Sequence, residues 1–267
     1  DRLPAREDRD GRRRPVAALV AIVHASAAGW RFVGSTRMVR GLTLGIVGAF
    51  VAVGGIASVG RLFVGDVGGG DAAYGLFFGG VFLGLALGMA SGRALLSGFS
   101  RRRLFGLTIA GAGVSLAITS VLPNLVLALA GVMTTGFFAG LAWVTGYTLL
   151  GGEVEDAVRG RTFAIVQTLV RITLFGVLAF APFLVGLIGY HRINLGNGSY
   201  IRADGATIVL LLGGLIAVFA GFVAYRAMDD RRGIPLHTDL VAAMRRRTPR
   251  RTPHSGLLIA IEGGEGA

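Results

Sequence analysis

The chain alternates long apolar runs with short segments that carry nearly all of its charged residues. A helix needs about 20 apolar residues to cross the hydrocarbon core of a bilayer. Residues 104–150 carry no formal charge and are too long for one span, so we divide them at Pro123-Asn124, a dipeptide typical of turns. The predicted spans are residues 41–60, 72–92, 104–121, 125–150, 162–190 and 206–225. The pattern therefore predicts an all-α polytopic membrane domain of six helices over residues 41–226.

Arginine in the connecting segments predicts the orientation of these spans. Arginines gather before the first span, after the second, after the fourth and after the sixth: Arg31, Arg37 and Arg40; Arg93, Arg101, Arg102 and Arg103; Arg159 and Arg161; and eight from Arg226 to Arg251. The other three connections are uncharged or weakly charged. Because basic loops stay on the cytoplasmic side, we expect a multi-pass protein of the cell (plasma) membrane with both ends cytoplasmic.

The overall composition agrees with a membrane domain and excludes several other classes. Hydrophobic residues make up 53% of the chain and charged residues 16%, and the mean hydropathy is +0.66. The net charge of +12 comes entirely from arginine, but the arginines lie at the ends of apolar runs and form no single soluble face. We therefore expect the lipid bilayer as a partner and no nucleic acid. With no cysteine and four scattered histidines, we predict no metal site.

One charged residue lies well inside a predicted span. Arg171 is ten residues beyond Arg161, or about 15 Å along a helix, and Gln167 lies one turn earlier on the same face. A charge in lipid needs a partner or a water-filled cavity, so both residues are candidates for transport or gating. The alternative is that the helix begins early and Arg171 snorkels to the headgroups.

Two further patterns in the spans have two interpretations each. Gly80, Gly84, Gly88 and Gly92 recur every four residues and form a groove for a neighbouring helix, which could be a sliding contact or static packing. Trp143, Thr145 and Tyr147 could line a cavity or belong to an interfacial aromatic belt. Pro182 is expected to kink the fifth span.

Residues 1–40 are predicted to form a cytoplasmic loop, with an interfacial or loop helix, that leads into the first span. Arg12-Arg13-Arg14, residues 16–25 and Ala25-Ser26-Ala27 resemble a signal peptide with its cleavage site. A signal peptide would place the arginines of residues 31–40 outside the cell, against the charge rule. We therefore favour the loop.

Residues 227–255 are predicted to be a basic cytoplasmic linker. Leu240, Val241 and Met244 beside Arg245-Arg246-Arg247 could form a short amphipathic helix on the anionic inner leaflet. A solvated tether without a lipid role explains the same residues, and both interpretations remain open.

The last residues have the pattern of a phosphate-binding loop. A β-branched run, Ile259-Ala260-Ile261, enters a glycine-rich turn, as at the start of G-x-x-x-x-G-K-[ST]. The candidate nucleotide-binding residues are Glu262, Gly263, Gly264, Glu265, Gly266 and Ala267. With Gly263 as the first glycine, the glycine, lysine and hydroxyl residue that complete the loop would follow Ala267. We expect the chain to be a fragment of a longer protein, without catalytic residues of its own.

The membrane region resembles the carboxyl-terminal half of a major facilitator superfamily (MFS) transporter. The resemblance covers roughly residues 29–226 and rests on Gly29-Trp30-Arg31-Phe32-Val33 ahead of six spans and on two loop motifs. Gly88, Gly92, Arg93 and Arg101-Arg102-Arg103 are similar to the family's glycine, acid and arginine motif without its acidic member; Arg159-Gly160-Arg161 after Glu153, Glu155 and Asp156 is similar to the loop before its penultimate helix. The resemblance implies a missing first half and adds Arg93, Arg159 and Arg161 to the transport or gating candidates.

Residues 256–267 resemble the first strand and the start of the P-loop of a thymidylate kinase, an α/β P-loop kinase. The resemblance implies a missing kinase domain that uses ATP and Mg²⁺ to convert dTMP into dTDP. We therefore expect an MFS-like half fused to a thymidylate kinase. The alternatives are a membrane anchor for the kinase that does not transport, and an MFS exporter with a fortuitous glycine-rich tail.

Overall fold

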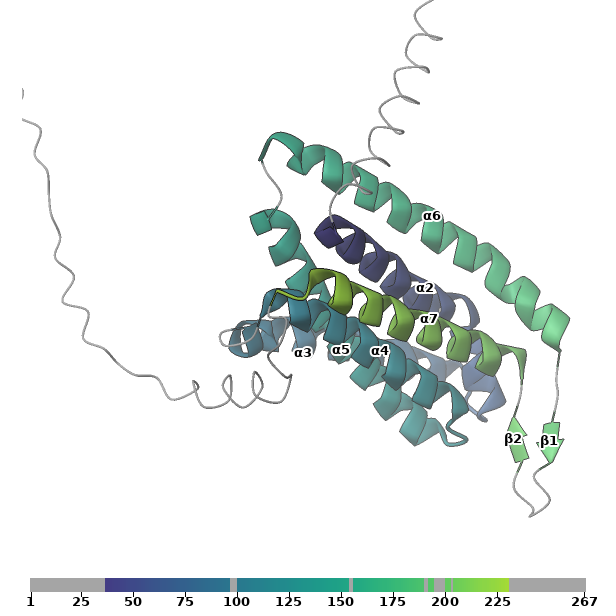
Figure 1. The fold of residues 1–267 in the computed structure, drawn as a ribbon. Coiled ribbons are helices and arrows are strands. Elements are labelled where there is room, and N and C mark those ends of the chain that lie inside the picture. The colour runs from purple at the N-terminus through teal and green to yellow at the C-terminus, as the bar shows by residue number, and fades with distance from the viewer. Residues whose placement is uncertain are drawn as a thin grey trace, which may run out of the picture.

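A computed structural model describes residues 37–96, 100–153, 156–189, 192–194, 200–202 and 204–230. Within these residues the chain forms six long helices and one short strand pair (Figure 1). The elements are α2 (Arg37–Asp66), α3 (Asp71–Leu96), α4 (Arg101–Val121), α5 (Leu125–Glu153), α6 (Asp156–Ile188), β1 (Arg192–Asn194), β2 (Tyr200–Arg202) and α7 (Gly205–Met228). All six helices are long and apolar enough to cross a membrane. The prediction of six apolar helices of spanning length is confirmed.

Consecutive helices run in opposite directions, so the bundle has two distinct ends. We call the end where α2 begins and α7 finishes the basic end, because Arg37, Arg101 and Arg226 lie there. The other end is the hairpin end, where β1 and β2 pair antiparallel between α6 and α7 (Figure 1). This strand pair was not predicted from the sequence.

The predicted division at Pro123-Asn124 is also confirmed. α4 ends at Val121 and α5 begins at Leu125. The Asn124 side-chain oxygen accepts hydrogen bonds from the backbone N–H groups of Val126, at 2.8 Å, and Leu127, at 3.4 Å. An Asn cap of this kind satisfies donors that the first turn of a helix leaves free, which fixes where α5 begins.

Most of the buried hydroxyl groups that the structure describes in the spans are satisfied without water, the exception being Thr43. Thr108, Thr119 and Thr145 each donate to a carbonyl one turn earlier in their own helix. Ser115 of α4 donates instead to the Gly131 carbonyl of α5, at 3.0 Å. Such bonds let polar residues lie in an apolar environment at little cost.

The helix contacts repeat when the first three helices are exchanged with the last three. The five most extensive contacts are α4 with α7, α3 with α5, α2 with α7, α4 with α5, and α2 with α6. Suppose that α2 is exchanged with α5, α3 with α6, and α4 with α7. The contact between α2 and α7 then becomes the contact between α5 and α4. In the same way, the contact between α3 and α5 becomes the contact between α6 and α2. The α4–α7 contact maps onto itself. Because each unit has three helices, the two units run in opposite directions, which is the arrangement of an inverted repeat.

Glycines make the closest of these contacts. α3 and α5 run in the same direction, and a Cβ added at Gly84 or Gly88 would meet the backbone carbonyl of Met133 or Phe137. From the other side, a Cβ at Gly136 or Gly140 of α5 would meet a backbone carbonyl of α3. Because both helices contribute glycines, their backbones touch directly along this seam.

A second glycine seam joins α4 to α7. A Cβ at Gly113 would lie 2.5 Å from the Gly214 carbonyl oxygen, and one at Gly214 would lie 2.8 Å from the Gly113 carbonyl oxygen. One heptad along, a Cβ at Gly221 would lie 2.7 Å from the Gly106 carbonyl oxygen. This antiparallel seam is the contact that the repeat maps onto itself.

The two least buried spans are α6 and α3. In the most apolar 18-residue stretch of each helix, only 6% of α6 and 17% of α3 is buried inside the bundle. The corresponding share in the other four helices is 39–56%. Figure 1 shows α6 along one edge of the bundle beside α2. Since α3 and α6 exchange in the repeat, the two exposed helices are equivalent members of their units.

Candidate functional site

Arg171 and Gln167 lie on an exposed face of α6. Both side chains are exposed, and they are four residues apart, so they share one face of the helix. Arg171 is six residues before Val177, the residue through which α6 meets α2 at Gly54, where an added Cβ would lie 3.0 Å from the Val177 Cβ. Six residues correspond to a rotation of about 120° away from that contact. Arg171 therefore points away from the α2 interface.

Two contacts fix the depth of Arg171 in the bundle. α6 is parallel to α2, so the Gly54–Val177 contact puts Arg171 level with Gly48. Gly48 is about 4 Å from the middle of the uncharged run 41–60, on the side of the basic end, at 1.5 Å per residue. At the hairpin end, Gly205 meets Val185, and the same count along α6 and α7 puts Arg171 about 5 Å from the middle, on the same side. The arginine thus lies close to the centre of the spans.

A row of aromatic rings connects α2, α5 and α6, with Phe50 close to that level and Trp143, Tyr147 and Phe163 on its basic side. The ring centroids of Phe50 and Trp143 are 6.4 Å apart, those of Trp143 and Tyr147 4.9 Å, and those of Tyr147 and Phe163 6.2 Å. Trp143 is 45% exposed and Tyr147 43%. Trp143 and Tyr147 therefore lie on an open surface, whereas Phe50 and Phe163 are half-buried and Phe163 packs against the core.

The polar pair continues this aromatic row along α6. Along α6, a residue of the resulting stripe occurs every four positions: Phe163, Gln167 and Arg171. The stripe runs from the basic end toward the centre of the helix. α5 runs in the opposite direction, and the Tyr147–Phe163 contact sets the register between the two helices. Trp143, one turn from Tyr147, is therefore at the level of Gln167. We call Phe50, Trp143, Gln167 and Arg171, with the Tyr147–Phe163 pair below them, the polar–aromatic site.

Electrostatically the polar–aromatic site has an uncompensated positive charge. Among the residues that the structure describes, Arg171 and Gln167 make no hydrogen bond or ion pair. The carboxylates whose side chains the structure describes lie at helix ends, far in depth from Arg171: Asp66, Asp71, Asp204, Asp229 and Asp230. A charge at this depth costs at least a few kcal/mol without a partner or water, so the site is suited to an anion.

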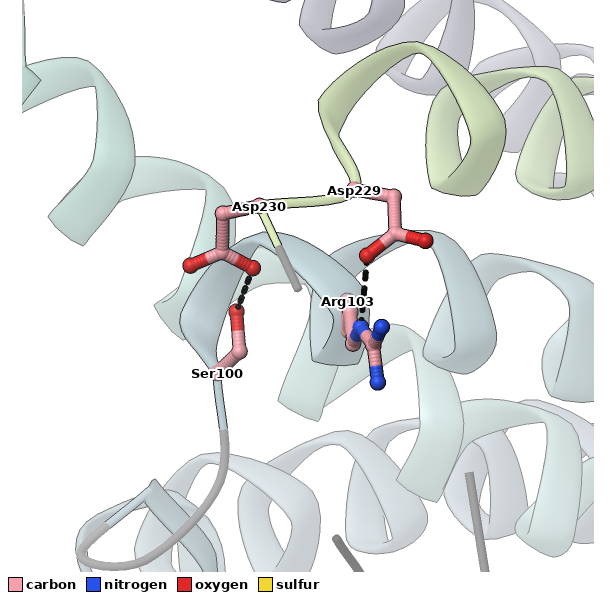
Figure 2. Close-up of polar contacts among 4 residues, drawn as sticks. All are labelled: Ser100, Arg103, Asp229 and Asp230. Carbon is pink, nitrogen blue, oxygen red and sulfur yellow. Dashed lines mark hydrogen bonds and ion pairs between the residues drawn. The ribbon is translucent and has the colours of Figure 1, made fainter. Parts of the chain in front are cut away.

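A second polar cluster joins α4 to the end of α7 (Figure 2). Arg103 is 1% exposed, and its Nε donates to Asp229 Oδ1 at 2.7 Å. Beside it, the Ser100 hydroxyl donates to Asp230 Oδ1, also at 2.7 Å. We call these four residues the clasp. It binds the residues just after α7 to the start of α4 at the basic end.

The sequence interpretation missed the acidic half of the clasp. Arg101-Arg102-Arg103 resembles a motif that lacks its acid, and the structure provides acids for Arg103 and Ser100 from more than 120 positions further along the chain. The available signal was Asp229-Asp230, an acidic pair directly after the last span of a basic chain.

Several predicted site residues lie outside the part of the chain that the structure describes. Arg93 belongs to α3 and Arg159 and Arg161 belong to α6, but their side chains are outside the described ones. The linker after Asp230 and the nucleotide-binding candidates Glu262, Gly263, Gly264, Glu265, Gly266 and Ala267 are also outside them. The predictions for these residues stay predictions.

Outside the polar–aromatic site, the described residues could also offer a metal site or a pocket. No group of three or more potential metal ligands occurs among the residues described. A shallow hollow lined by Ala179, Phe180 and Phe183 lies on the half of α6 toward the hairpin end, but its lining is apolar and offers nothing to orient a polar ligand.

Comparison with known proteins gives no assignment, because neither a protein-family model nor a curated protein matches the chain.

Proposed function

We propose that the six-helix domain is one half of an MFS-type secondary transporter, and that the longer chain continues into a thymidylate kinase. The inverted repeat of helix contacts carries the first part. Secondary transporters are commonly built from such repeats, with three-helix units nested in each half of the MFS fold and the substrate site near the bilayer midplane. Arg171 near the middle of the spans is consistent with that site.

The exposed helices also support a half-transporter over a simple anchor. α3 and α6 exchange in the repeat, and both leave most of their surface unburied. A second six-helix half would cover equivalent faces of the two units. An anchor needs only apolar length, and neither the repeat nor a central arginine has a role in it.

We propose that the basic end is cytoplasmic, because arginine-rich connections are retained on that side. In this orientation the clasp lies at the cytoplasmic surface, where the linker to the kinase begins. The hairpin end, with its weakly charged connections, then faces the outside.

Alternating access can be tested without knowing the substrate. The chain has no cysteine, so single cysteines can be placed in the full-length protein after removal of any others. Ala57→Cys lies on the hairpin side of the centre and Thr168→Cys on the basic side, and both positions are exposed. We expect an impermeant maleimide to label Ala57→Cys from outside and Thr168→Cys from inside. Attachment of a bulky maleimide at Ala57→Cys should then lower labelling at Thr168→Cys several-fold, because the cavity is held open to one side.

The control is Ile216→Cys on α7, which is 46% exposed but lies on the helix of the central seam, away from the polar–aromatic site. It should not react from either side, because lipid excludes the reagent. Independent labelling of Ala57→Cys and Thr168→Cys, or labelling of neither, would contradict alternating access and favour the anchor.

The kinase part rests on residues 256–267 and has its own test. The full-length protein should phosphorylate dTMP with ATP and Mg²⁺, and replacing the lysine of its P-loop should abolish this activity. The chain of residues 1–267 alone should not bind ATP at micromolar concentration, because a P-loop needs the lysine and the helix N-terminus that follow it. Micromolar binding to this chain, or no dTMP kinase activity in the full-length protein, would contradict the proposal.

A further inference from the structure

No side chain that the structure describes neutralises the charge of Arg171. The residue is exposed near the centre of α6, and the described carboxylates all lie at helix ends. A positive charge in a low-dielectric region attracts an anion far more strongly than the same charge in water. Among the described residues, Arg171 is therefore a cation without an anionic partner.

The surroundings of Arg171 define what kind of anion would fit. Gln167, one turn away, offers an amide that can both donate and accept hydrogen bonds. The exposed Trp143 lies at the level of Gln167, with its ring in the aromatic row that reaches α6 through Tyr147 and Phe163. A small hydrated inorganic ion gains little from such rings, whereas a planar organic group can stack on them.

The site also has a boundary on one side. Tyr147 and Phe163 approach across α5 and α6 with their ring centroids 6.2 Å apart. Phe163 is two turns from Arg171 on the same stripe, which places the ring pair between Arg171 and the basic end. A ligand held at Arg171 would thus have the Tyr147 and Phe163 rings on its side toward the basic end.

We infer that the polar–aromatic site binds an aromatic organic anion. Its anionic group contacts the Arg171 guanidinium and the Gln167 amide, and its ring lies against Trp143. This inference rests on the proposed function only in taking the ligand as the transported substrate, and binding itself can be measured independently of transport.

Trp143 provides the signal for a binding test. The chain has two tryptophans, so the Trp30→Phe variant of the full-length protein, with any others outside this chain replaced, has Trp143 as its only reporter. The protein is placed in nanodiscs of phosphatidylcholine and titrated with benzenesulfonate, a permanent anion, or with its neutral analogue benzenesulfonamide. We expect a saturable change in Trp143 emission with benzenesulfonate and about tenfold weaker binding of the sulfonamide, since that ligand lacks the charge-assisted hydrogen bond.

Substitutions connect this preference to the arginine. Arg171→Gln should remove the preference for the anion, and Arg171→Lys should keep most of it because the charge remains. The matched control is Arg226→Gln. Arg226 is also exposed and lies 4.9 Å from the centroid of the Phe222 ring, but it is at the basic end of α7. This variant should bind benzenesulfonate as the parent does.

Two other partners for Arg171 predict different results. If an acid of the missing half or a lipid phosphate neutralises Arg171, benzenesulfonate and benzenesulfonamide should bind equally weakly, and Arg171→Gln should change neither; this result overturns the inference. If Arg171→Gln does not accumulate in the membrane, the comparison of the two ligands on the parent protein still decides, because equally weak binding of both overturns the inference.

Transport is measured separately, as uptake of radiolabelled benzenesulfonate into proteoliposomes. Uptake that Arg171→Gln leaves unchanged would overturn the site and leave the transporter proposal standing. Selective binding without uptake would support the site and contradict the transporter proposal. Selective binding and uptake that both depend on Arg171 would support the two together.

Discussion

At the scale of single residues, the missing Cβ of glycine decides how closely α3 and α5 approach. A Cβ at Gly84 would meet the Met133 carbonyl and lie 2.9 Å from the backbone nitrogen of Phe137. These are backbone atoms, which cannot rotate away as a side chain can. We expect Gly84→Ala to destabilise the bundle by about 1–3 kcal/mol, as overpacking does elsewhere.

Gly79→Ala is the matched control, because Gly79 lies on the same helix and a Cβ there meets nothing within 4 Å. It should leave stability unchanged or raise it slightly, since alanine favours a helix over glycine. Unfolding of the purified protein in detergent, followed by circular dichroism, compares the two variants. Equal stability of both would show that α3 and α5 are less tightly joined than described.

The clasp gives a second comparison between residues. Asp229→Asn removes the charge that faces Arg103, a side chain only 1% exposed. Breaking one side of a buried ion pair costs about 3–5 kcal/mol, and the other contacts of Arg103 would reduce that figure. We therefore expect a clear loss of stability in the same unfolding experiment.

The control for the clasp is the exposed pair at the hairpin end. Arg61 and Asp71 are also 2.7 Å apart, but their side chains are 71% and 84% exposed. Asp71→Asn should cost about 0–1 kcal/mol, because water and salt screen an exposed pair. A loss at Asp71→Asn as large as that at Asp229→Asn would mean that burial does not set the strength of the clasp.

The sequence predicts the features of these residues that depend on local pattern, but not those that depend on contacts with distant parts of the chain. Arg171 stands out from sequence alone, since it is the one charge well inside an apolar run. Its depth does not, because depth depends on the contacts of Val177 with Gly54 and of Val185 with Gly205. The pairing of Arg103 with Asp229 is likewise a tertiary contact that no local pattern encodes.

At the scale of helices, orientation is the property that most needs a measurement. Gly70 precedes α3 at the hairpin end and Gly151 is near the end of α5 at the basic end; both are exposed, and a Cβ at either meets nothing within 4 Å. With intact cells and an impermeant maleimide, we expect Gly70→Cys to be labelled and Gly151→Cys to be protected until the cells are opened. The reverse pattern would invert the orientation.

Helix number and helix boundaries were not equally predictable. The apolar runs indicated all six spans, and the turn at Pro123-Asn124 separated α4 from α5, because both signals are local. α5 continues to Glu153 and α6 begins at Asp156, beyond the apolar limits, since a helix does not have to end where lipid ends. The β1–β2 pair was missed because three-residue strands are too short to show alternation.

At the scale of the whole molecule, the repeat was not visible in the sequence, because it is a property of contacts. The glycine stripe on α3 was predicted to be a groove, and the structure fills it with α5. Direct contact of backbones on both sides favours static packing over sliding, since movement along the seam would drive carbonyls past one another. Rearrangement of the bundle is then expected where contacts are few, at α6.

The contact between α2 and α7 also has a consequence for the order in which the bundle is made. Gly48 of the first helix meets Ala220 of the last, about 170 residues later in the chain. At a synthesis rate of about 5–20 residues per second, α2 waits roughly 10–30 s in the membrane before its main partner exists. α4 waits as well, because its longest seam is also with α7. A ribosome that stalls before residue 205 therefore releases a product in which the small-residue grooves of α2 and α4 remain unfilled.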